Sequence, residues 1–545
     1  MNDINPVIIE LLNKRGVFSE DDIIEFLSEK PKKTYDPFLL LNMGAGVDLI
    51  LSVIGRNEEI CIYGDYDADG ITSICLLTGV LSHLTDKLGY YVPSRFDEGY
   101  GLNKKAIESI AARGARMIIT VDCGSASHAE TEYAKGLGLE VVVTDHHNIT
   151  DKISDCPVIN PKQPDCGYPF KHLAGVGVAF KLAQGIREKT GLPKQVLTEC
   201  LDLVAIGTIG DIVPLVDENR TLAKYGMREL NKLGRKGLME LAGASSLKAG
   251  GISSDNIAFN IVPQINAVGR MMSADYAVEL LLSNDDEAIR ENVTKLVESN
   301  TERKKIQEDT YQYCVEIVEK DLKDNKCLTI FSPDAHEGIA GIVAGKIKDK
   351  YNKPAIIITS SGGMLKGTGR SPEPINLYDL LSGFKEMFIK FGGHASACGF
   401  LMGPEHLKPL TCGLEKKTGE ILGKEAGPAD EGGGCDMKLN GYDVTFELGE
   451  AIECLAPFGN QNRKPVFCVS GVNIANAYLM GGTGKHMRFT GCCPDGGALP
   501  CVLFNKAEEY GETIGANKPV DIYGTIEAQV WNGAKRMQFM VEKIT

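Results

Sequence analysis

The chain lacks any long apolar run, since no stretch approaches the roughly 18 consecutive apolar residues that a membrane-spanning helix needs. Its first residues, Met1–Asn5, also lack a basic region followed by an apolar segment, which is the pattern of a secretory signal. We therefore expect a cytoplasmic protein with no membrane partner.

An excess of positive charge is also missing. The formal net charge is -15 and the sequence pI is about 5.3. Such a balance argues against a generally basic protein that coats nucleic acid. It does not exclude an enzyme that acts on nucleic acid, because metal ions and a local basic groove can attract phosphate while the rest of the surface stays acidic.

Cysteines in the spacing of a zinc site are absent as well. The chain has 16 cysteines, but no CxxC pair occurs, and the adjacent Cys492 and Cys493 are poorly spaced for zinc. Disulfides are rare in the reducing cytosol. We expect reduced thiols rather than a disulfide framework or a structural metal site.

What the chain does contain is an alternation of short apolar runs and helical segments over residues 51–273, after a helical lead-in over residues 1–50. Runs typical of strands are Ile60–Tyr63, Gly89–Pro93, Met117–Val121, Glu140–Thr144 and Pro157–Ile159. Segments with helical spacing separate several of them, at Ile71–Leu84, Lys104–Arg113 and Ala126–Gly136. This repeated βα pattern predicts an α/β fold with a doubly wound parallel sheet.

The remainder of the chain divides into three further parts. Residues 274–325 are polar and helix-rich, which predicts a long connecting helix, or two, whose charge run Asn300–Lys305 is a solvated face. Residues 326–426 have the pattern of a second, smaller α/β unit with Gly-rich loops. Gly, Pro and acidic residues cluster near Gly427–Gly434. Five short β-like runs follow in residues 435–545, and they predict a small closed barrel of the OB type.

Four acidic or histidine-bearing stretches stand out in the first α/β unit. They carry Asp65, Asp67 and Asp69; Asp122; Asp145, His146 and His147; and Asp211. The first three stretches follow runs that we interpret as strands, and Asp211 ends a fourth apolar stretch. The carboxyl ends of parallel strands share one edge of such a sheet, so these groups should converge there. Because like charges this close repel strongly, a divalent metal is the simplest neutraliser.

The donor types in this cluster also indicate which metal. Asp65, Asp67 and Asp69 alternate, so in an extended chain all three would point to one side of the strand end. An oxygen-rich set with one or two imidazoles favours Mn²⁺ or Mg²⁺ over a thiolate zinc site. One bridging carboxylate would place two ions roughly 3.5–4 Å apart, as in phosphoester displacement. Taken singly, the DxDxDG pattern also resembles half a calcium loop, and a His-His pair is commonly surface or core decoration.

These stretches resemble motifs I to IV of the DHH phosphoesterase superfamily, with Asp145–His147 as the triplet that names it. Other motifs, in the expected order, resemble the single-strand-specific 5′→3′ exonucleases of that superfamily: Pro93–Gly101, Leu173–Ala179, Asn266–Arg270, Lys366–Ser371 and Gly392–Ala395. The resemblance runs from about Tyr35 to the carboxyl terminus. It implies a DHH catalytic domain, a DHHA1-type substrate-binding domain and an OB-like barrel that binds nucleic acid.

The resemblance implies roles for the residues of the cluster. The metal ligands would be Asp67, Asp69, Asp122, His146 and Asp211, with Asp65 as a nearby carboxylate of the same site, and the cofactor would be two Mn²⁺ or Mg²⁺ ions. Asp145 would orient an imidazole. His147 would face the scissile phosphate, and Arg270 would neutralise the phosphate near the metals.

The resemblance also implies a 5′-phosphate and nucleotide site in the second α/β unit. Its residues would be Gly369, Arg370, Ser371, Gly392, Gly393 and His394, where glycines let a phosphate approach backbone N–H groups. Arg95 would join them from the first domain, and Tyr100 would stack on a base. Without the resemblance, a plain turn explains each Gly-rich loop at least as well. A surface ion pair is then the simpler explanation for each arginine, and a buried position in a turn is the competing explanation for Tyr100.

Together these features predict a two-metal exonuclease that degrades single-stranded DNA 5′→3′ to mononucleotides, in recombination and repair. One alternative is a DHH phosphodiesterase for short oligonucleotides or cyclic dinucleotides, which would leave the carboxyl-terminal barrel without a role. Another is a non-catalytic replication scaffold, against which the intact ligand set argues. The partners would be single-stranded DNA with a 5′ end, a helicase and a single-strand-binding protein, and we expect a monomer.

Overall fold

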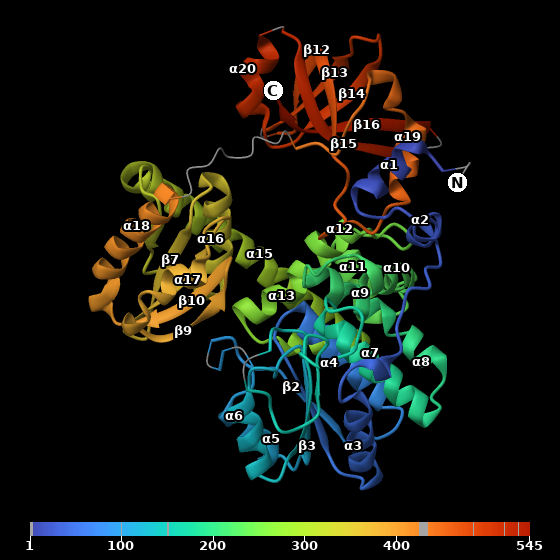
Figure 1. The fold of residues 1–545 in the computed structure, drawn as a ribbon, viewed down its shortest axis with the longest axis vertical. Helices are drawn as coiled ribbons and strands as arrows, with labels where there is room; N and C mark the ends of the chain where they lie inside the picture. The colour runs from blue at the N-terminus through green and yellow to red at the C-terminus, as the bar shows by residue number, and fades with distance from the viewer. Residues whose placement is uncertain are drawn as a thin grey trace.

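The computed structural model describes residues 4–96, 98–99, 101–149, 152–424, 434–482, 484–516, 518–531 and 534–545. Figure 1 shows three lobes: a sheet with its helices, a second α/β lobe reached through one long helix, and a barrel at the carboxyl terminus. This architecture confirms the fold class expected from the sequence. All 16 cysteines are free. In the described part of the chain, no helix has the length and apolar character needed to cross a membrane.

The sheet of the first lobe has five parallel strands in the order β2-β1-β3-β4-β5. The strands are β1 (Ile60–Gly64), β2 (Leu88–Tyr91), β3 (Met117–Val121), β4 (Glu140–Thr144) and β5 (Val158–Ile159). Every residue of β1 and β3 is buried. Strands that are covered on both faces have this continuous apolar character, which is why the sequence pattern located them well.

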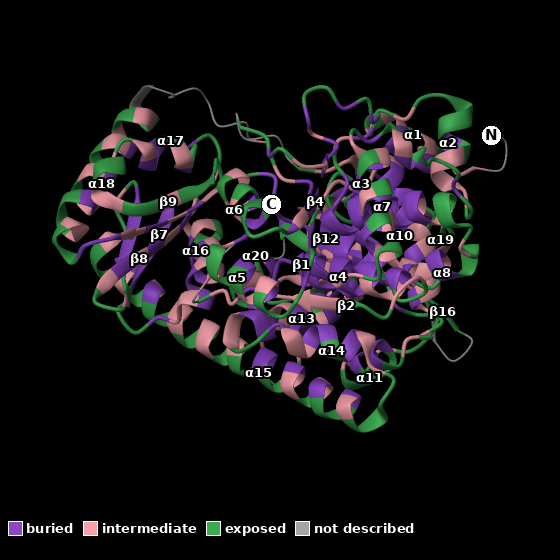
Figure 2. Ribbon diagram, turned by 90° about the horizontal axis from the view of Figure 1, so that it is seen from below, coloured by how far each residue is buried: buried purple, intermediate pink, exposed green. Residues whose placement is uncertain are grey.

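Helices cover both faces of this sheet. Ile60 and Ile62 face the core that contains α3 (Met43–Gly55), α4 (Ala68–Leu81) and α7 (Gly175–Thr190). Cys61 and Tyr63 face the core that contains α5 (Lys104–Ala112) and α6 (His128–Gly136). The larger core, purple in Figure 2, continues into the helices that follow the sheet. The other helical segments of this lobe are η1 (Pro37–Leu39), α8 (Lys194–Thr198), α9 (Leu201–Gly210), α10 (Asp217–Leu230), α11 (Lys236–Ala244), α12 (Ser254–Asn256), η2 (Ile257–Ile261), α13 (Val262–Met271) and α14 (Asp275–Leu282).

The second lobe is reached through α15 (Asp286–Ile317), a 32-residue helix that spans about 48 Å at 1.5 Å per residue. Its sheet has the order β6-β7-β8-β10-β9. The strands are β6 (Leu328–Phe331), β7 (Ala355–Ser361), β8 (Met364–Arg370), β9 (Phe388–His394) and β10 (Ala397–Met402). The helical segments are η3 (Val318–Leu322), α16 (Glu337–Tyr351), α17 (Leu377–Ser382), η4 (Lys385–Met387), η5 (Pro404–His406) and α18 (Leu407–Lys424).

The Gly-rich stretches of this lobe are strands, so the expectation of loops is wrong. Gly367–Arg370 lies in β8 and Gly392–His394 lies in β9, and both strands pair with β10. The strands need glycine because neighbouring groups pack closely against them: a Cβ on Gly367 would lie 2.0 Å from the ring of Phe400. Glycine weakens a strand pattern, which explains why the sequence did not reveal these two.

The carboxyl-terminal lobe is a six-stranded sheet in the order β11-β12-β13-β14-β16-β15, and the pairing of β12 with β15 closes it into a barrel. The strands are β11 (Met437–Lys438), β12 (Phe467–Met480), β13 (His486–Cys492), β14 (Ala498–Leu503), β15 (Val520–Trp531) and β16 (Ala534–Ile544). The helical segments are η6 (Gly441–Asp443), α19 (Phe446–Glu453) and α20 (Ala507–Gly515). The boundary predicted near Gly427–Gly434 lies outside the described residues, except for Gly434.

Two amino-terminal helices, α1 (Pro6–Lys14) and α2 (Glu20–Leu27), lie beside the barrel (Figure 1). Side chains of α1 share one buried apolar cluster with side chains of α19: Ile8, Leu11, Leu12, Leu448 and Ile452. Helix α3, by contrast, packs in the core of the first lobe. The lead-in over residues 1–50 is therefore divided between two hydrophobic cores.

Candidate metal centre

The turn between β1 and α4 carries the first three aspartates. Asp67 is the N-cap of α4, and its Oδ1 accepts hydrogen bonds from the backbone N–H groups of Asp69 (3.0 Å) and Gly70 (3.1 Å). Such a cap satisfies N–H groups that the first turn of a helix leaves unpaired. A Cβ on Gly70 would lie 2.4 Å from the carbonyl oxygen of Asp65, so this turn requires glycine.

The chain is not extended as far as Asp69, so the alternation of the three aspartates does not place them on one side of a strand end. β1 ends at Gly64 and α4 begins at Ala68, so Asp69 lies in the first helical turn. The cap at Asp67 starts the helix earlier than the apolar pattern from Ile71 indicates. Asp69 therefore reaches the cluster from a helix, whereas Asp65 reaches it from the end of a strand.

The amino terminus of α7 holds Asp69 in place. The N–H groups of Gly175 and Val176 donate to its carboxylate at 2.6 and 2.8 Å, where the helix dipole favours negative charge. A Cβ on Gly175 would lie 2.5 Å from Asp122 Oδ1, and one on Gly207 would lie 2.7 Å from Asp69 Oδ1. Glycine is required at both positions because the helix backbone there lies directly against the carboxylates of Asp122 and Asp69.

His146 presents a bare ring nitrogen to the carboxylates. Nε2 is buried and has no hydrogen-bond partner among the described residues. Nε2 lies 3.1 Å from Asp122 Oδ1, 3.5 Å from Asp211 Oδ2 and 4.0 Å from Asp69 Oδ2. Burial, followed by the charge of the next histidine, lowers the pKa of His146 to about 3 and keeps the ring neutral. This is the usual form of an imidazole that binds metal.

Asp145 organises the other histidine. Its carboxylate accepts hydrogen bonds from the backbone N–H groups of His146 (2.7 Å), His147 (3.0 Å) and Ser125 (2.8 Å). Its Oδ1 also lies 2.8 Å from Nδ1 of His147. Burial acts to raise the pKa of Asp145, but the hydrogen bond and charge of His147 lower it below its ordinary value. Against the effect of burial, the same hydrogen bond raises the pKa of His147. Asp145 therefore orients His147.

The six predicted ligands lie in one cluster. Three groups of three side chains offer ligand atoms within 4.8 Å of one another: Asp65, Asp67 and Asp122; Asp69, His146 and Asp211; and Asp122, His146 and His147. Asp122 and His146 each belong to two of these groups, which joins the three groups into one cluster. Oδ1 of Asp65 and Nε2 of His146 are buried without a hydrogen-bond partner in the described ranges. This donor set fits two divalent cations that prefer oxygen.

The carboxylates of the cluster raise one another's pKa. Burial is the largest cause and the charges of neighbouring aspartates come next. Together they raise the pKa of Asp69 to about 7, of Asp65 to about 8 and of Asp211 to about 9. The pKa of Asp122 lies well above its ordinary value for the same reasons. Cations that bind here must displace protons, because ligating carboxylates are ionised.

Three arginines form a cationic group beside these carboxylates. Arg95 lies over the ring of Tyr66, with Cζ 4.0 Å from the ring centroid. Nη1 of Arg270 donates to the carbonyl oxygen of Gly338, in α16, at 2.8 Å. Burial, followed by the charges of Arg95 and Arg303, lowers the pKa of Arg270 to about 10. Guanidinium groups that repel one another in this way are stabilised by an anion, and phosphate matches their donor geometry.

Sequence reasoning missed Arg303. The interpretation of Asn300–Lys305 as a solvated face is wrong for this residue, which is half-buried. Its guanidinium donates to Asn300 Oδ1 and Gln307 Oε1 on the same helix. It lines the same pocket as Arg270. The signal in the sequence is that its neighbours at i-3 and i+4 are amides rather than the acids typical of a solvated helix face.

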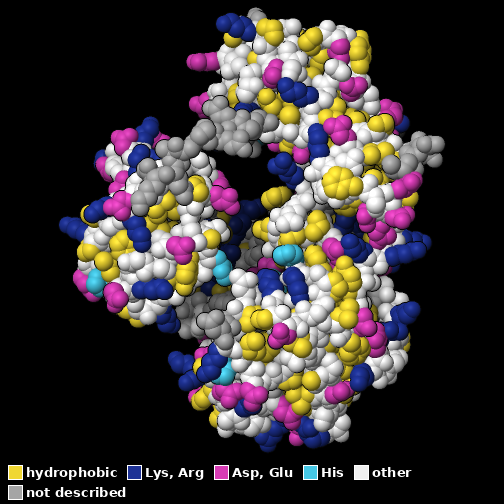
Figure 3. Space-filling model, viewed as in Figure 1, with side chains coloured by type: hydrophobic (Ala, Val, Ile, Leu, Met, Phe, Trp, Pro, Cys, Tyr) yellow, Lys and Arg dark blue, Asp and Glu magenta, His cyan; other side chains and the backbone are white. Residues whose placement is uncertain are grey.

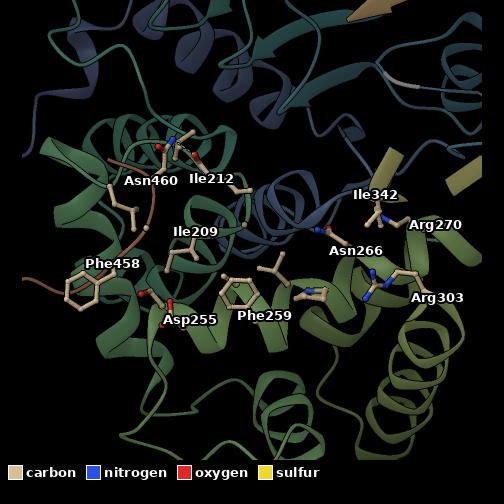
Figure 4. A pocket seen from close by; sticks show the side chains of 18 residues that line it. Ile209, Ile212, Asp255, Phe259, Asn266, Arg270, Arg303, Ile342, Phe458 and Asn460 are labelled. Atoms are coloured by element: carbon tan, nitrogen blue, oxygen red, sulfur yellow. Dashed lines mark hydrogen bonds between the residues drawn. The ribbon is translucent and has the colours of Figure 1, made fainter. Parts of the chain in front are cut away.

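A pocket of about 410 Å³ opens next to the cluster, and it is lined by parts of all three lobes. Arg270 and Arg303 lie at one end, with Ile342 of α16 (Figure 4). Ile212 and Asn460 lie at the other end. The other lining residues that Figure 4 labels are Ile209, Asp255, Phe259, Asn266 and Phe458. Figure 3 shows Lys and Arg side chains around the hollow between the lobes.

The six residues expected to bind the 5′ end lie on the second sheet or directly after one of its strands, and not among the carboxylates: Gly369, Arg370, Ser371, Gly392, Gly393 and His394. Arg370 and His394 pair with Ala397 of β10 from opposite sides. Helix α16 links the two sets, because Gly338 contacts Arg270 and a Cβ on Gly341 would lie 3.1 Å from Nη2 of Arg370. Tyr100 lies outside the described residues, so its role stays a prediction.

Three family models match the chain. They are the DHH family, N-terminal domain, over residues 59–208, the DHHA1 domain over residues 323–411, and the RecJ OB domain over residues 435–543. The matches fall in the first, second and third lobes, respectively.

Curated relatives and solved structures cover nearly the whole chain. The single-stranded-DNA-specific exonuclease RecJ of Bacillus subtilis (strain 168) is 37% identical over 543 residues, which are 99% of this chain and 68% of the relative. The RecJ of Haemophilus influenzae is 31% identical over 99% of this chain and 96% of the relative. The crystal structure of RecJ from Thermus thermophilus in complex with Mn²⁺ has a TM-score of 0.84 at 25% identity, over 100% of this chain and 76% of that one. The chain therefore belongs to the RecJ family.

Proposed function

We propose that the chain is an exonuclease that hydrolyses single-stranded DNA from its 5′ end to mononucleotides, with two Mn²⁺ or Mg²⁺ ions as cofactor. The observation that carries the proposal is the cluster in which Asp122 and His146 each belong to two ligand groups. Relatives named as single-stranded-DNA-specific exonucleases support the activity. Crystal structures of RecJ in complex with Mn²⁺ and with Mg²⁺ support the cofactor.

The side chains of the cluster take distinct roles in this proposal. The metal ligands are Asp65, Asp67, Asp69, Asp122, His146 and Asp211. When bound, two divalent ions would lower the pKa of a water molecule and offset charge on the attacking and leaving oxygens. Asp145 keeps His147 oriented and raises its pKa, so that His147 can present a positive charge to the scissile phosphate. Arg270 neutralises the charge of the same phosphate.

The strand would enter along the pocket and end at the second lobe. Phe259 and Ile212 are 72% and 70% exposed and line the pocket, where they offer bases an apolar surface. Arg370 would bind the 5′ phosphate through its fork of N–H donors, and Ser371 would add a hydroxyl. Because the first phosphodiester then lies at the carboxylates, cleavage would release one nucleotide at a time.

The parts of the chain would divide this work. We assign residues 51–273 to the catalytic domain, 274–325 to the connecting helix, 326–426 to recognition of the 5′ end, and 435–545 to a barrel that holds the strand behind it. Residues 1–50 would help to dock the barrel. We further infer that the protein acts as a monomer in the cytoplasm, with a helicase and a single-strand-binding protein, because a duplex offers single strands only after unwinding.

The test uses 5′-labelled and 3′-labelled single strands of graded length, with and without Mn²⁺. The proposal expects a labelled mononucleotide from the 5′ label at the earliest times, gradual shortening of the 3′-labelled strand, and no cleavage in chelator. A preference for dinucleotides would replace the proposal with a small-substrate phosphodiesterase. Strand binding without any metal-dependent cleavage would replace it with a scaffold protein.

A further inference from the structure

In the segment that leads into the barrel, Asn460 contacts the turn that directly follows Asp211. Its Nδ2 donates to the backbone carbonyl of Ile212 at 2.7 Å, and its own carbonyl accepts from the N–H of Leu215 at 2.8 Å. Figure 4 shows Asn460 and Ile212 side by side at one end of the pocket. Asn460 thus contacts both ends of the turn over residues 212–215, which directly follows Asp211.

This turn contains a strained residue. Ile212 has φ 57°, in the left-handed region that β-branched side chains avoid, and its side chain is 70% exposed. Burial of Ile212 therefore does not hold the strained backbone in place. A hydrogen bond to its carbonyl oxygen restrains the turn directly, and Asn460 donates one. Strain of this kind persists where surrounding groups over-determine the backbone.

The loop that carries Asn460 is itself held from several sides. Asn462 is buried, and its Nδ2 donates to the carbonyls of Leu455 (2.9 Å) and Pro457 (2.7 Å). Arg220 of α10 donates to the carbonyls of Leu455 and Ala456, at 2.9 Å each. The amide of Asn460 therefore extends from a fixed backbone, so it can restrain the turn over residues 212–215 rather than follow it.

Among the assigned ligands nearest His146, Asp211 is the one least held by packing. Its side chain is 24% exposed, compared with 1% for Asp69, 3% for Asp122 and 8% for His146. The buried ligands are fixed by packing on all sides, whereas Asp211 caps the end of α9 at the edge of the pocket. The direction of its carboxylate depends on the backbone that follows it.

We propose that Asn460 is a positioning residue of the metal centre. By holding the carbonyl of Ile212, it directs the Asp211 carboxylate toward Nε2 of His146, and so couples docking of the barrel to metal affinity. The inference rests on the proposed function, because it requires Asp211 to be a metal ligand.

The test measures Mn²⁺ binding to the full chain by titration calorimetry without DNA, beside the Mn²⁺ concentration that gives half-maximal cleavage. Asn460→Ala removes the amide, and Asn460→Asp keeps its shape but replaces the donor with an acceptor. Both should weaken Mn²⁺ binding about tenfold, the lower end of losses for groups that orient metal ligands. The rate at saturating Mn²⁺ should stay close to that of the wild type. Gln461→Ala, an exposed position on the same loop, is the matched control and should leave both quantities unchanged.

Two further variants separate the possible outcomes. Asp211→Asn should weaken Mn²⁺ binding more than either Asn460 variant. If Asp211→Asn leaves binding unchanged, the ligand assignment in the proposed function fails. If Asp211→Asn weakens binding but Asn460→Ala does not, only the role of Asn460 fails. Ile212→Gly removes the strain, so Asn460→Ala should have a smaller effect in that background. An equal effect in both backgrounds would overturn the proposed route through Ile212.

Discussion

At the carboxyl end of β3, Asp122 adopts a left-handed backbone conformation with φ 58°. Few side chains tolerate this region, but Asp and Asn do so better than most. The conformation turns the carboxylate back toward the cluster, where its Oδ1 lies 3.1 Å from His146 Nε2. Asparagine is therefore the substitution that removes the charge and keeps both the shape and the backbone.

Asp122→Asn should lower cleavage by roughly 100- to 1000-fold or more, the scale on which one group that stabilises transition-state charge acts. Affinity for a single strand, measured by fluorescence anisotropy in chelator, should stay close to that of the wild type. The melting temperature of the metal-free protein should not fall, because the variant removes repulsion among buried carboxylates. Retained turnover would contradict the assignment of Asp122.

Gly175→Ala tests the contact between α7 and the carboxylates. Its Cβ would lie 2.5 Å from Asp122 Oδ1, so either the helix or the carboxylate must move. We expect calorimetry to show Mn²⁺ affinity at least about tenfold weaker, as for other groups that orient ligands. Gly79→Ala in α4 is the control, because its Cβ would approach nothing closer than Cys200 Sγ at 4.0 Å. The control should bind Mn²⁺ normally and gain about 0.5–1 kcal/mol of stability from helix propensity. Equal Mn²⁺ affinity in both variants would show that the contact is unimportant.

The raised pKa values predict an unusual dependence of stability on pH. With folded pKa values of about 7 for Asp69, 8 for Asp65 and 9 for Asp211, the folded metal-free protein binds more protons than the unfolded chain, whose carboxyl pKa values lie near 4. The stability that these groups contribute is fully present below the unfolded pKa values near 4. It is lost as pH rises through the folded pKa values of about 7 to 9. The melting temperature of the metal-free protein should therefore fall between pH 6 and pH 9, and Mn²⁺ should reverse the fall. A metal-free melting temperature that rises over this range would contradict the burial of the cluster.

Among the elements, the parallel sheet could be predicted because its central strands β1, β3 and β4 are buried on both faces and form continuous apolar runs. β8 and β9 could not, since glycines required by close packing gave them the pattern of loops. The convergence of Asp122 and His146 could be predicted because each lies within two residues of a strand end. The backbone N–H groups of Gly175 and Val176 that hold Asp69 leave no signal in residue type.

The π-helical segment η2 presents Phe259 to the pocket with 72% of its surface exposed. Such irregular helical turns often occur at functional sites. Phe259→Ala should weaken binding of a single strand by about 1–3 kcal/mol, the range for one stacked base, without changing Mn²⁺ affinity. Phe18, which is 71% exposed between α1 and α2, provides the matched control, and Phe18→Ala should bind the strand normally. Equal losses in both variants would mean that Phe259 has no specific contact with DNA.

At the scale of the whole molecule, the two ends of the chain share one core. α1 packs on α19 and the barrel, and Arg220 of the first lobe donates to the carbonyl of Phe26 as well as to the segment before the barrel. The position of the barrel relative to the metal centre therefore depends on residues that precede the catalytic sheet. The sequence predicted a helical lead-in over residues 1–50 but could not indicate what α1 and α2 contact, because an amphipathic face does not identify its partner.

Leu12→Ala tests this packing. Leu12 is fully buried in the shared cluster, and its truncation should lower the free energy of unfolding of the barrel by about 2–5 kcal/mol, as for other core leucines. Glu10→Ala, on the exposed side of the same helix, should change it by less than about 1 kcal/mol. Hydrogen exchange of β12 and β15 would report the difference. Unchanged protection in Leu12→Ala would contradict a common core.

The shared core also sets an order on biosynthesis. Helix α19 begins roughly 430 residues after α1 ends, which at 5–20 residues per second is a delay of tens of seconds between their synthesis. During this interval the apolar face of α1 is exposed on the nascent chain and available to a chaperone. Assembly of the barrel on the catalytic lobe must wait until α19 has been translated, so termination before α19 would leave a truncated product with an unsatisfied, aggregation-prone helix α1.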